Sequence, residues 1–267
     1  MSRPTIISSA WRHRELVWQL AKREVIGRYR GSALGLLWSF FNPLLMLLVY
    51  TFVFGTVFRA RWEQRTGTSA EFAIFLFAGL IVHGLFAECV TRAPLLILAN
   101  VNFVKRVIFP LEILPWVTMG SALFHALVSF AVLFVFGVVV QLPLHWTLTL
   151  LPLVFFPLIM LTMGLSWFLA STSVFVRDLG HTVGIAVSVL MFLSPVFYPV
   201  SALPPAYRPL VYLNPLTFVI EQTRAVLIWG KLPDWPGLLV YTLCSIAIAW
   251  LGFVLFQRTR RGFADVL

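Results

Sequence analysis

The residues that could carry chemistry are few, because only 11% of the 267 residues are charged and most of these flank long apolar segments. Two carboxylates lie beside arginines at helical spacing: Glu88 precedes Arg92 by four positions, and Glu221 precedes Arg224 by three. Both spacings bring side chains together on a helix. A carboxylate inside an apolar segment could relay protons or ions, but Glu88 lies near the end of its segment. We therefore interpret both pairs as structural ion pairs, which argues against a proton- or sodium-coupled carrier.

The remaining reactive side chains do not gather into a catalytic or metal site. The five histidines are scattered, and His83 and Glu88, on one predicted helix, lie about 140° apart around its axis. Gly230-Lys231 lacks both the upstream glycine and the following Ser or Thr of a phosphate-binding P-loop. We therefore expect no catalytic residue, no metal site and no bound cofactor in this chain.

Aromatic side chains make up 15% of the sequence. Their ring faces could pack against the apolar C–H faces of sugars, so a passage lined by rings could conduct a glycan. The alternative is that they form interfacial belts or face lipid, as aromatic residues of membrane proteins commonly do. The candidate channel residues are Trp38, Phe40, Phe41, Tyr50, Phe197 and Tyr198.

The elements that must position these residues are membrane helices, because 60% of the chain is hydrophobic and the aqueous segments are short. A membrane helix requires about 20 apolar residues. The sequence predicts an all-α integral membrane protein in which a domain of six transmembrane helices covers 33–256. The predicted spans are 33–58, 72–91, 113–142, 146–176, 182–200 and 236–256.

The basic residues predict the orientation of these spans. With both termini in the cytoplasm, the inner segments, including the tail 257–267, hold 14 Lys and Arg, against 6 in the outer segments. Because basic residues favour the cytoplasmic side, this orientation is expected, although three arginines in 59–71 would lie outside.

Two segments are predicted not to cross the membrane. The N-terminal segment 1–32 is too charged to span, and its helical periodicity predicts an amphipathic interfacial helix whose apolar face Glu24 and Arg28 interrupt. The region 194–235 holds seven prolines, and its apolar part is about half the length of a span. We expect short re-entrant helices on the external side; an ordinary loop on the headgroups is the alternative.

Four motifs in a fixed order resemble one known family. They are "RYRGSALGLLWSFFNPLLMLLVYTFVFGTVF" (28–58), "NFVKRVIFPLEILP" (102–115), "RDLGHTV" with "SPVFYPVSALP" (177–204), and "YLNPLTFVIEQTR" (212–224). Together they look like the membrane subunit, or permease, of polysaccharide-exporting ABC transporters in the bacterial inner membrane. The match covers nearly the whole chain. Val82-His83 departs from the Pro-Trp pair expected there, which leaves any role of that helix end open.

The resemblance implies a homodimer of six-span subunits that works with two copies of a cytoplasmic ATPase, which binds ATP and Mg²⁺. It implies a lipid-linked glycan as substrate, contact with membrane lipids and no nucleic acid. It also implies that the segment between spans two and three forms a coupling helix that docks on the ATPase. This helix would contain Asn100, Asn102, Phe103, Val104, Lys105 and Arg106.

Other interpretations of the sequence remain open. Without the resemblance, Lys105 and Arg106 would be interpreted as topology signals only. An ABC exporter of a small hydrophobic compound is one alternative, because the superclass that the sequence resembles also contains such exporters. A membrane-embedded glycosyl- or acyltransferase would require a polar catalytic cluster, and a passive channel would conduct without ATP.

Overall fold

The computed structural model describes residues 9, 11–57, 69–104, 109–143 and 145–266. These residues form helices and turns and contain no strand, which confirms the predicted all-α fold. Five apolar helical segments are long enough to cross a membrane, so the chain is an integral membrane protein. The remaining predicted span, 182–200, corresponds to a shorter apolar helix, Leu179–Leu193.

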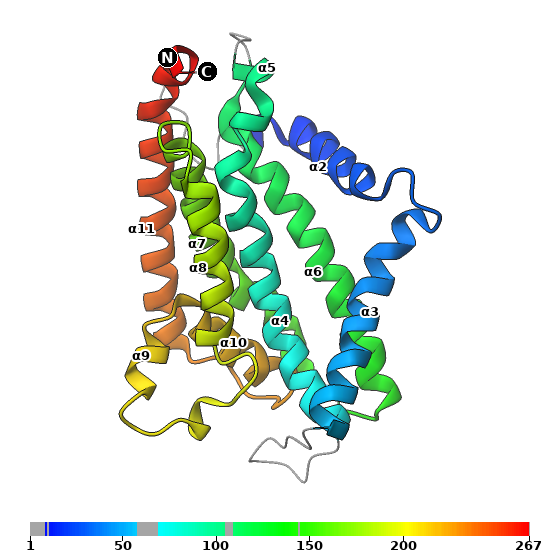
Figure 1. The fold of residues 1–267 in the computed structure, drawn as a ribbon. Helices are drawn as coiled ribbons and strands as arrows, with labels where there is room; N and C mark the ends of the chain where they lie inside the picture. The colour runs from blue at the N-terminus through cyan, green and yellow to red at the C-terminus, as the bar shows by residue number, and fades with distance from the viewer. Residues whose placement is uncertain (1–8, 10, 58–68, 105–108, 144, 267) are drawn as a thin grey trace.

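The helices follow one another along the chain with short 3₁₀ turns between several of them (Figure 1). They are α2 (Arg14–Tyr29), α3 (Trp38–Tyr50, continued by a π-helical segment Thr51–Val57), α4 (Ser69–Arg92), α5 (Val101–Val104), α6 (Leu114–Val139), α7 (Leu151–Thr172), α8 (Leu179–Leu193), α9 (Arg208–Tyr212), α10 (Pro215–Leu227), α11 (Trp235–Thr259) and α12 (Phe263–Val266).

Helix α4 forms the centre of the bundle. It packs against α6, α7, α8 and α10, and its span is the most buried of the five, whereas the span that contains α3 is the least buried. The fifth span is predicted to end at 200, but helix α8 ends at Leu193. Pro195 follows directly, and a proline disfavours helical backbone in the residue before it; Ser194 is extended, with ψ 147°.

The most extensive helix pair is α7 with α11. Gly164 of α7 and Gly252 of α11 allow the two backbones to approach closely, because a Cβ atom at Gly164 would lie 2.6 Å from the carbonyl oxygen of Ile248. Small residues serve this purpose in membrane helix packing, where burial from lipid supplies no driving force.

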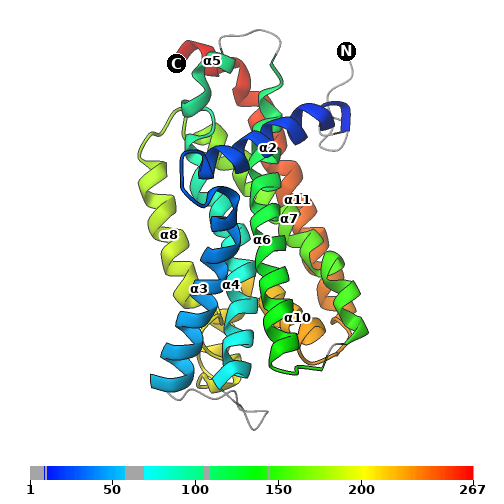
Figure 2. The same ribbon diagram turned by 90° about the vertical axis from the view of Figure 1, so that its right-hand side faces the viewer.

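The two ends of the bundle differ in the elements that they carry (Figures 1 and 2). Helices α2, α5 and α12 and the connection between α7 and α8 lie at one end, at the top of both views, and α9 and α10 lie at the other. Ser173 Oγ donates a hydrogen bond to the carbonyl oxygen of Pro94 at 2.7 Å, which ties the α7–α8 connection to the chain after α4.

Candidate functional site

The short helix α5 occupies the position between α4 and α6 for which a coupling helix is expected. A 3₁₀ turn, Leu98–Asn100, leads into it, and Asn100 Nδ2 donates to the carbonyl oxygen of Leu96 at 2.8 Å. The side chain of Asn102 is exposed. The element lies at the end of the bundle (Figure 1), and the amide side chain of Asn102 is available to a partner.

The ring of Phe103 is half-buried and stacks on Phe109, with ring centroids 4.2 Å apart and planes 12° apart. This contact joins the two sides of the connection between α5 and α6. Lys105 and Arg106 lie outside the described residues, and Val104 is placed in α5 only by its backbone. The role of all these residues in coupling stays a prediction.

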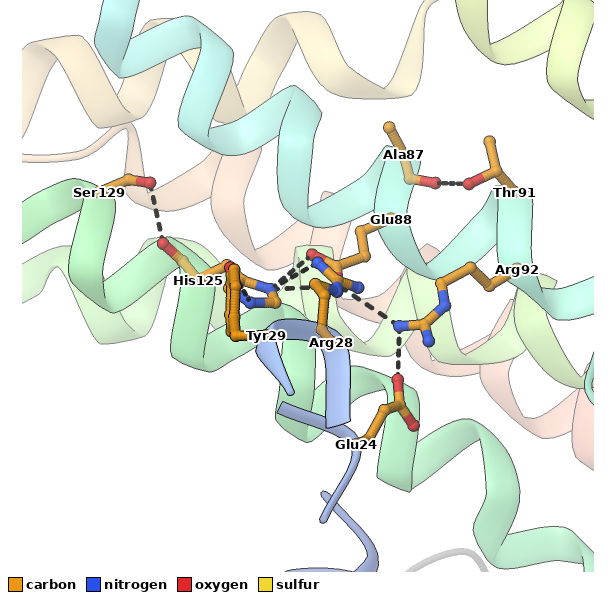
Figure 3. A network of polar contacts seen from close by, with 9 residues as sticks. All are labelled: Glu24, Arg28, Tyr29, Ala87, Glu88, Thr91, Arg92, His125 and Ser129. Carbon is orange, nitrogen blue, oxygen red and sulfur yellow. Dashed lines mark hydrogen bonds and ion pairs between the residues drawn. The ribbon is translucent and has the colours of Figure 1, made fainter. Parts of the chain in front are cut away.

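A network of charged side chains connects α2, α4 and α6 close to the same end (Figure 3). Arg28 of α2 forms an ion pair with Glu88 of α4, and His125 Nδ1 of α6 lies 3.0 Å from the other carboxylate oxygen of Glu88. Arg92 Nη1 lies 3.4 Å from Glu88 and pairs with Glu24 of α2. The structure thus brings Glu88 and Arg92 together as their spacing predicts, and adds partners from two other helices.

The network is balanced in charge, since two carboxylates face two guanidinium groups. An arrangement of this kind holds helices together better than it attracts an ion. Tyr29 closes one side of it, with its hydroxyl 3.3 Å from His125 Nε2. Burial raises the pKa of Tyr29 above its ordinary value, so the hydroxyl stays neutral at physiological pH.

Sequence reasoning identified Glu24 and Arg28 only as interruptions of an apolar face. They are the residues by which α2 contacts α4. Their i,i+4 spacing indicates that Glu24 and Arg28 lie on one side of α2, but it does not indicate which helix that side contacts.

At the opposite end, the guanidinium of Arg224 in α10 is 2% exposed. It donates to the carbonyl oxygens of Phe75 at 3.0 Å, Pro195 at 2.6 Å and Val196 at 2.9 Å. Glu221 lies 3.3 Å away and is itself 39% exposed. The predicted pair is therefore close, but most contacts of Arg224 are with backbone of α4 and of the chain after α8, which the sequence could not reveal.

The six aromatic candidates divide into two groups. Trp38, Phe40 and Phe41 lie in the first turn of α3, where Phe40 and Phe41 are exposed. At the far end of α3, Tyr50 lies 6.2 Å from Phe54, whose ring stacks on Phe197 at 5.8 Å between centroids.

Tyr198 does not extend this ring cluster in the same way. Its hydroxyl donates to the carbonyl oxygens of Phe192 and Leu193, which closes the end of α8. Whether any of these rings lines a passage stays a prediction. Among the residues that the structure describes, no three His, Cys, Asp or Glu side chains are placed to hold a metal ion.

A central apolar helix surrounded by helices of membrane-spanning length defines a helical integral membrane protein. Residues 15–228 match the family described as ABC-2 type transporter, and the chain belongs to this family. The resemblance to ABC transporter permeases is thereby confirmed.

Several curated relatives match over almost their whole length. The O-antigen export system permease protein RfbA of Myxococcus xanthus is 29% identical over 97% of this chain and 98% of its own. An RfbA of Klebsiella pneumoniae is 27% identical, with 95% of both chains covered. The polysialic acid transport protein KpsM of Escherichia coli is 25% identical, over 89% of this chain and 90% of its own.

Proposed function

We propose that this chain is the permease subunit of an ABC transporter that exports a polysaccharide, in lipid-linked form, across the bacterial inner membrane. The observation that carries the proposal is the end-to-end match with permeases named for export of O-antigen and transport of polysialic acid. The apolar helical bundle supports it, because these helices are long enough to span the bilayer.

A separate ATPase subunit supplies the energy in this proposal and binds ATP and Mg²⁺. Helix α5 is the docking element, because it is short, lies at the end of the bundle (Figure 1) and is followed directly by Lys105 and Arg106. Motion of a docked partner would reach α4 and α6 through the two ends of this segment.

Two copies of the chain, with two ATPase copies, form the working unit in this proposal. Exposed apolar side chains of α3, among them Phe41, Leu45 and Met46, form a surface that lipid or a second copy of the chain covers in this proposal. Both α2 and α12 lie at the α5 end (Figure 1), which supports placing both termini in the cytoplasm beside the ATPase.

Deletion of the gene in its native host, with complementation on a plasmid, tests the proposal. We expect the surface polysaccharide to disappear and the lipid-linked glycan to accumulate in the cytoplasmic leaflet of the inner membrane. Both effects should revert on complementation. If the deletion strain has normal surface polysaccharide and retains a small hydrophobic compound, the substrate is such a compound and not a glycan.

A further inference from the structure

A buried carboxylate lies where the α5 segment returns into the bundle. Glu112, in the 3₁₀ turn Leu111–Ile113 before α6, is 5% exposed. Its Oε2 accepts a hydrogen bond from Arg260 Nη1 at 2.7 Å, and its Oε1 accepts one from Ser9 Oγ at 3.4 Å. Its backbone carbonyl accepts from Trp167 Nε1 at 3.1 Å. Glu112 therefore contacts α7 and the chain end of α11 at once.

Arg260 also contacts the return segment directly. Its Nη2 donates to the carbonyl oxygen of Phe109 at 3.4 Å. Phe109 in turn stacks on Phe103 of α5 at 4.2 Å between ring centroids. A continuous set of contacts thus runs from α5 through Phe109 to the guanidinium of Arg260.

Arg260 is itself held firmly to α11. It opens the 3₁₀ turn Arg260–Gly262 that follows α11, and the next residue, Phe263, is fully buried. The ring of Phe263 packs edge-to-face on Phe256 of α11 at 5.6 Å and lies 6.2 Å from Phe175 in the α7–α8 connection. Displacement of Arg260 would therefore require displacement of the end of α11.

We infer that Glu112 and Arg260 form a mechanical link through which movement of the α5 segment reaches α11 as well as α4 and α6. A buried carboxylate that loses its cation is strongly disfavoured, so the pair resists separation while the two elements move. The inference rests on the proposed function, because a docked ATPase is what moves α5. In this role Glu112 and Arg260 are positioning residues for export and contact no substrate.

Nitroxide labels test the link without reference to substrate. The labels are attached to cysteines that replace two exposed residues, Asn102 in α5 and Arg258 at the end of α11. The exposed Cys244 is changed to Ser so that it does not take up label. We expect a single narrow distance distribution in the purified chain. Glu112→Gln and Arg260→Gln should broaden it or add a second peak, whereas Arg260→Lys, which keeps the cation, should restore the narrow distribution.

Arg261→Gln is the matched control, since Arg261 lies exposed in the same turn and no ion pair is assigned to it within the described part of the chain. An unchanged distribution in Glu112→Gln and Arg260→Gln overturns the inference. Equal broadening in Arg261→Gln also overturns it, because the cause would then be loss of any cation. If Glu112→Gln fails to fold, Arg260→Gln decides, since Arg260 is 31% exposed.

A transport measurement then separates the link from the proposed function. In the complex with its ATPase, both Gln variants should keep ATP hydrolysis close to that of the unmodified complex and lower surface polysaccharide about fivefold. Export and hydrolysis that fall together would overturn the link. A chain that purifies without an ATPase would contradict the proposed function, while the label distances would still report on the contact between α5 and α11.

Discussion

Among single residues, Arg224 is a buried cation with many hydrogen bonds. Its guanidinium donates to three backbone carbonyls from two other parts of the chain. We predict that Arg224→Met lowers the free energy of unfolding by about 2–4 kcal/mol, because hydrogen bonds from a charged donor are lost and the carbonyls of Pro195 and Val196 lose their donor. Thermal unfolding of the purified protein in detergent measures this.

Arg208→Met is the control for that prediction. Arg208 also donates to two carbonyls, of Leu203 and Ser201, but at the surface. Water replaces those contacts, so we expect a cost well below that of Arg224→Met. Equal costs in the two variants would contradict the view that burial makes Arg224 important.

The glycines between α7 and α11 support a second prediction at this scale. A Cβ atom at Gly252 would overlap the carbonyl oxygen of Gly164. We predict that Gly252→Ala destabilises the protein by about 1–3 kcal/mol, because the helices must separate. Gly184→Ala in α8, where a Cβ meets nothing within 4 Å, should leave the unfolding midpoint unchanged; a comparable loss there would assign the effect to helical glycines in general.

Among the helices, α2 packs mainly against α6 and is joined to α4 by the ion pairs of Glu24 and Arg28. We predict that Glu24→Lys, which places like charges beside Arg92, raises amide hydrogen exchange in α2 about two- to fivefold, as expected for a partly exposed pair. Hydrogen exchange with mass spectrometry over 14–29 measures this. Glu15→Lys makes the same charge change on an exposed part of α2, and an equal increase there would contradict the role of the pair.

The two cations that directly follow helix α5 are expected to be needed for export. We expect Lys105→Glu combined with Arg106→Glu to abolish export while membrane insertion stays normal, because reversed charge would repel the complementary surface of the ATPase. Surface polysaccharide and membrane content of the tagged chain are the two measurements.

The matched control for α5 is Arg177→Glu combined with Arg258→Glu. It reverses two exposed cations at the same end of the bundle, and we expect export to continue. Normal export by the Lys105 and Arg106 variant would remove α5 from the coupling pathway.

At the scale of the whole molecule, hydropathy predicted the helical membrane fold because long apolar runs have few alternatives in a bilayer. It placed the fifth span too far along the chain, where Pro195 ends the helix. Local spacing found the pairs Glu88–Arg92 and Glu221–Arg224.

Contacts between distant segments could not be predicted from the sequence. The ion pair of Arg28 with Glu88 and that of Glu112 with Arg260 join residues far apart in the chain. Such contacts depend on how the helices are rotated and packed, which periodicity along one helix does not determine.

In the proposed function, the chain moves a lipid-linked glycan with energy from a partner ATPase. The most direct test uses inside-out inner-membrane vesicles from the host, in which the outward-facing cytoplasmic leaflet carries lipid-linked glycan labelled with radioactive sugar. We predict that ATP moves the labelled glycan into the vesicle lumen, protected from an added glycosidase, and that vesicles from the deletion strain do not show this protection. Equal protection with and without ATP, or in the deletion strain, would contradict the account.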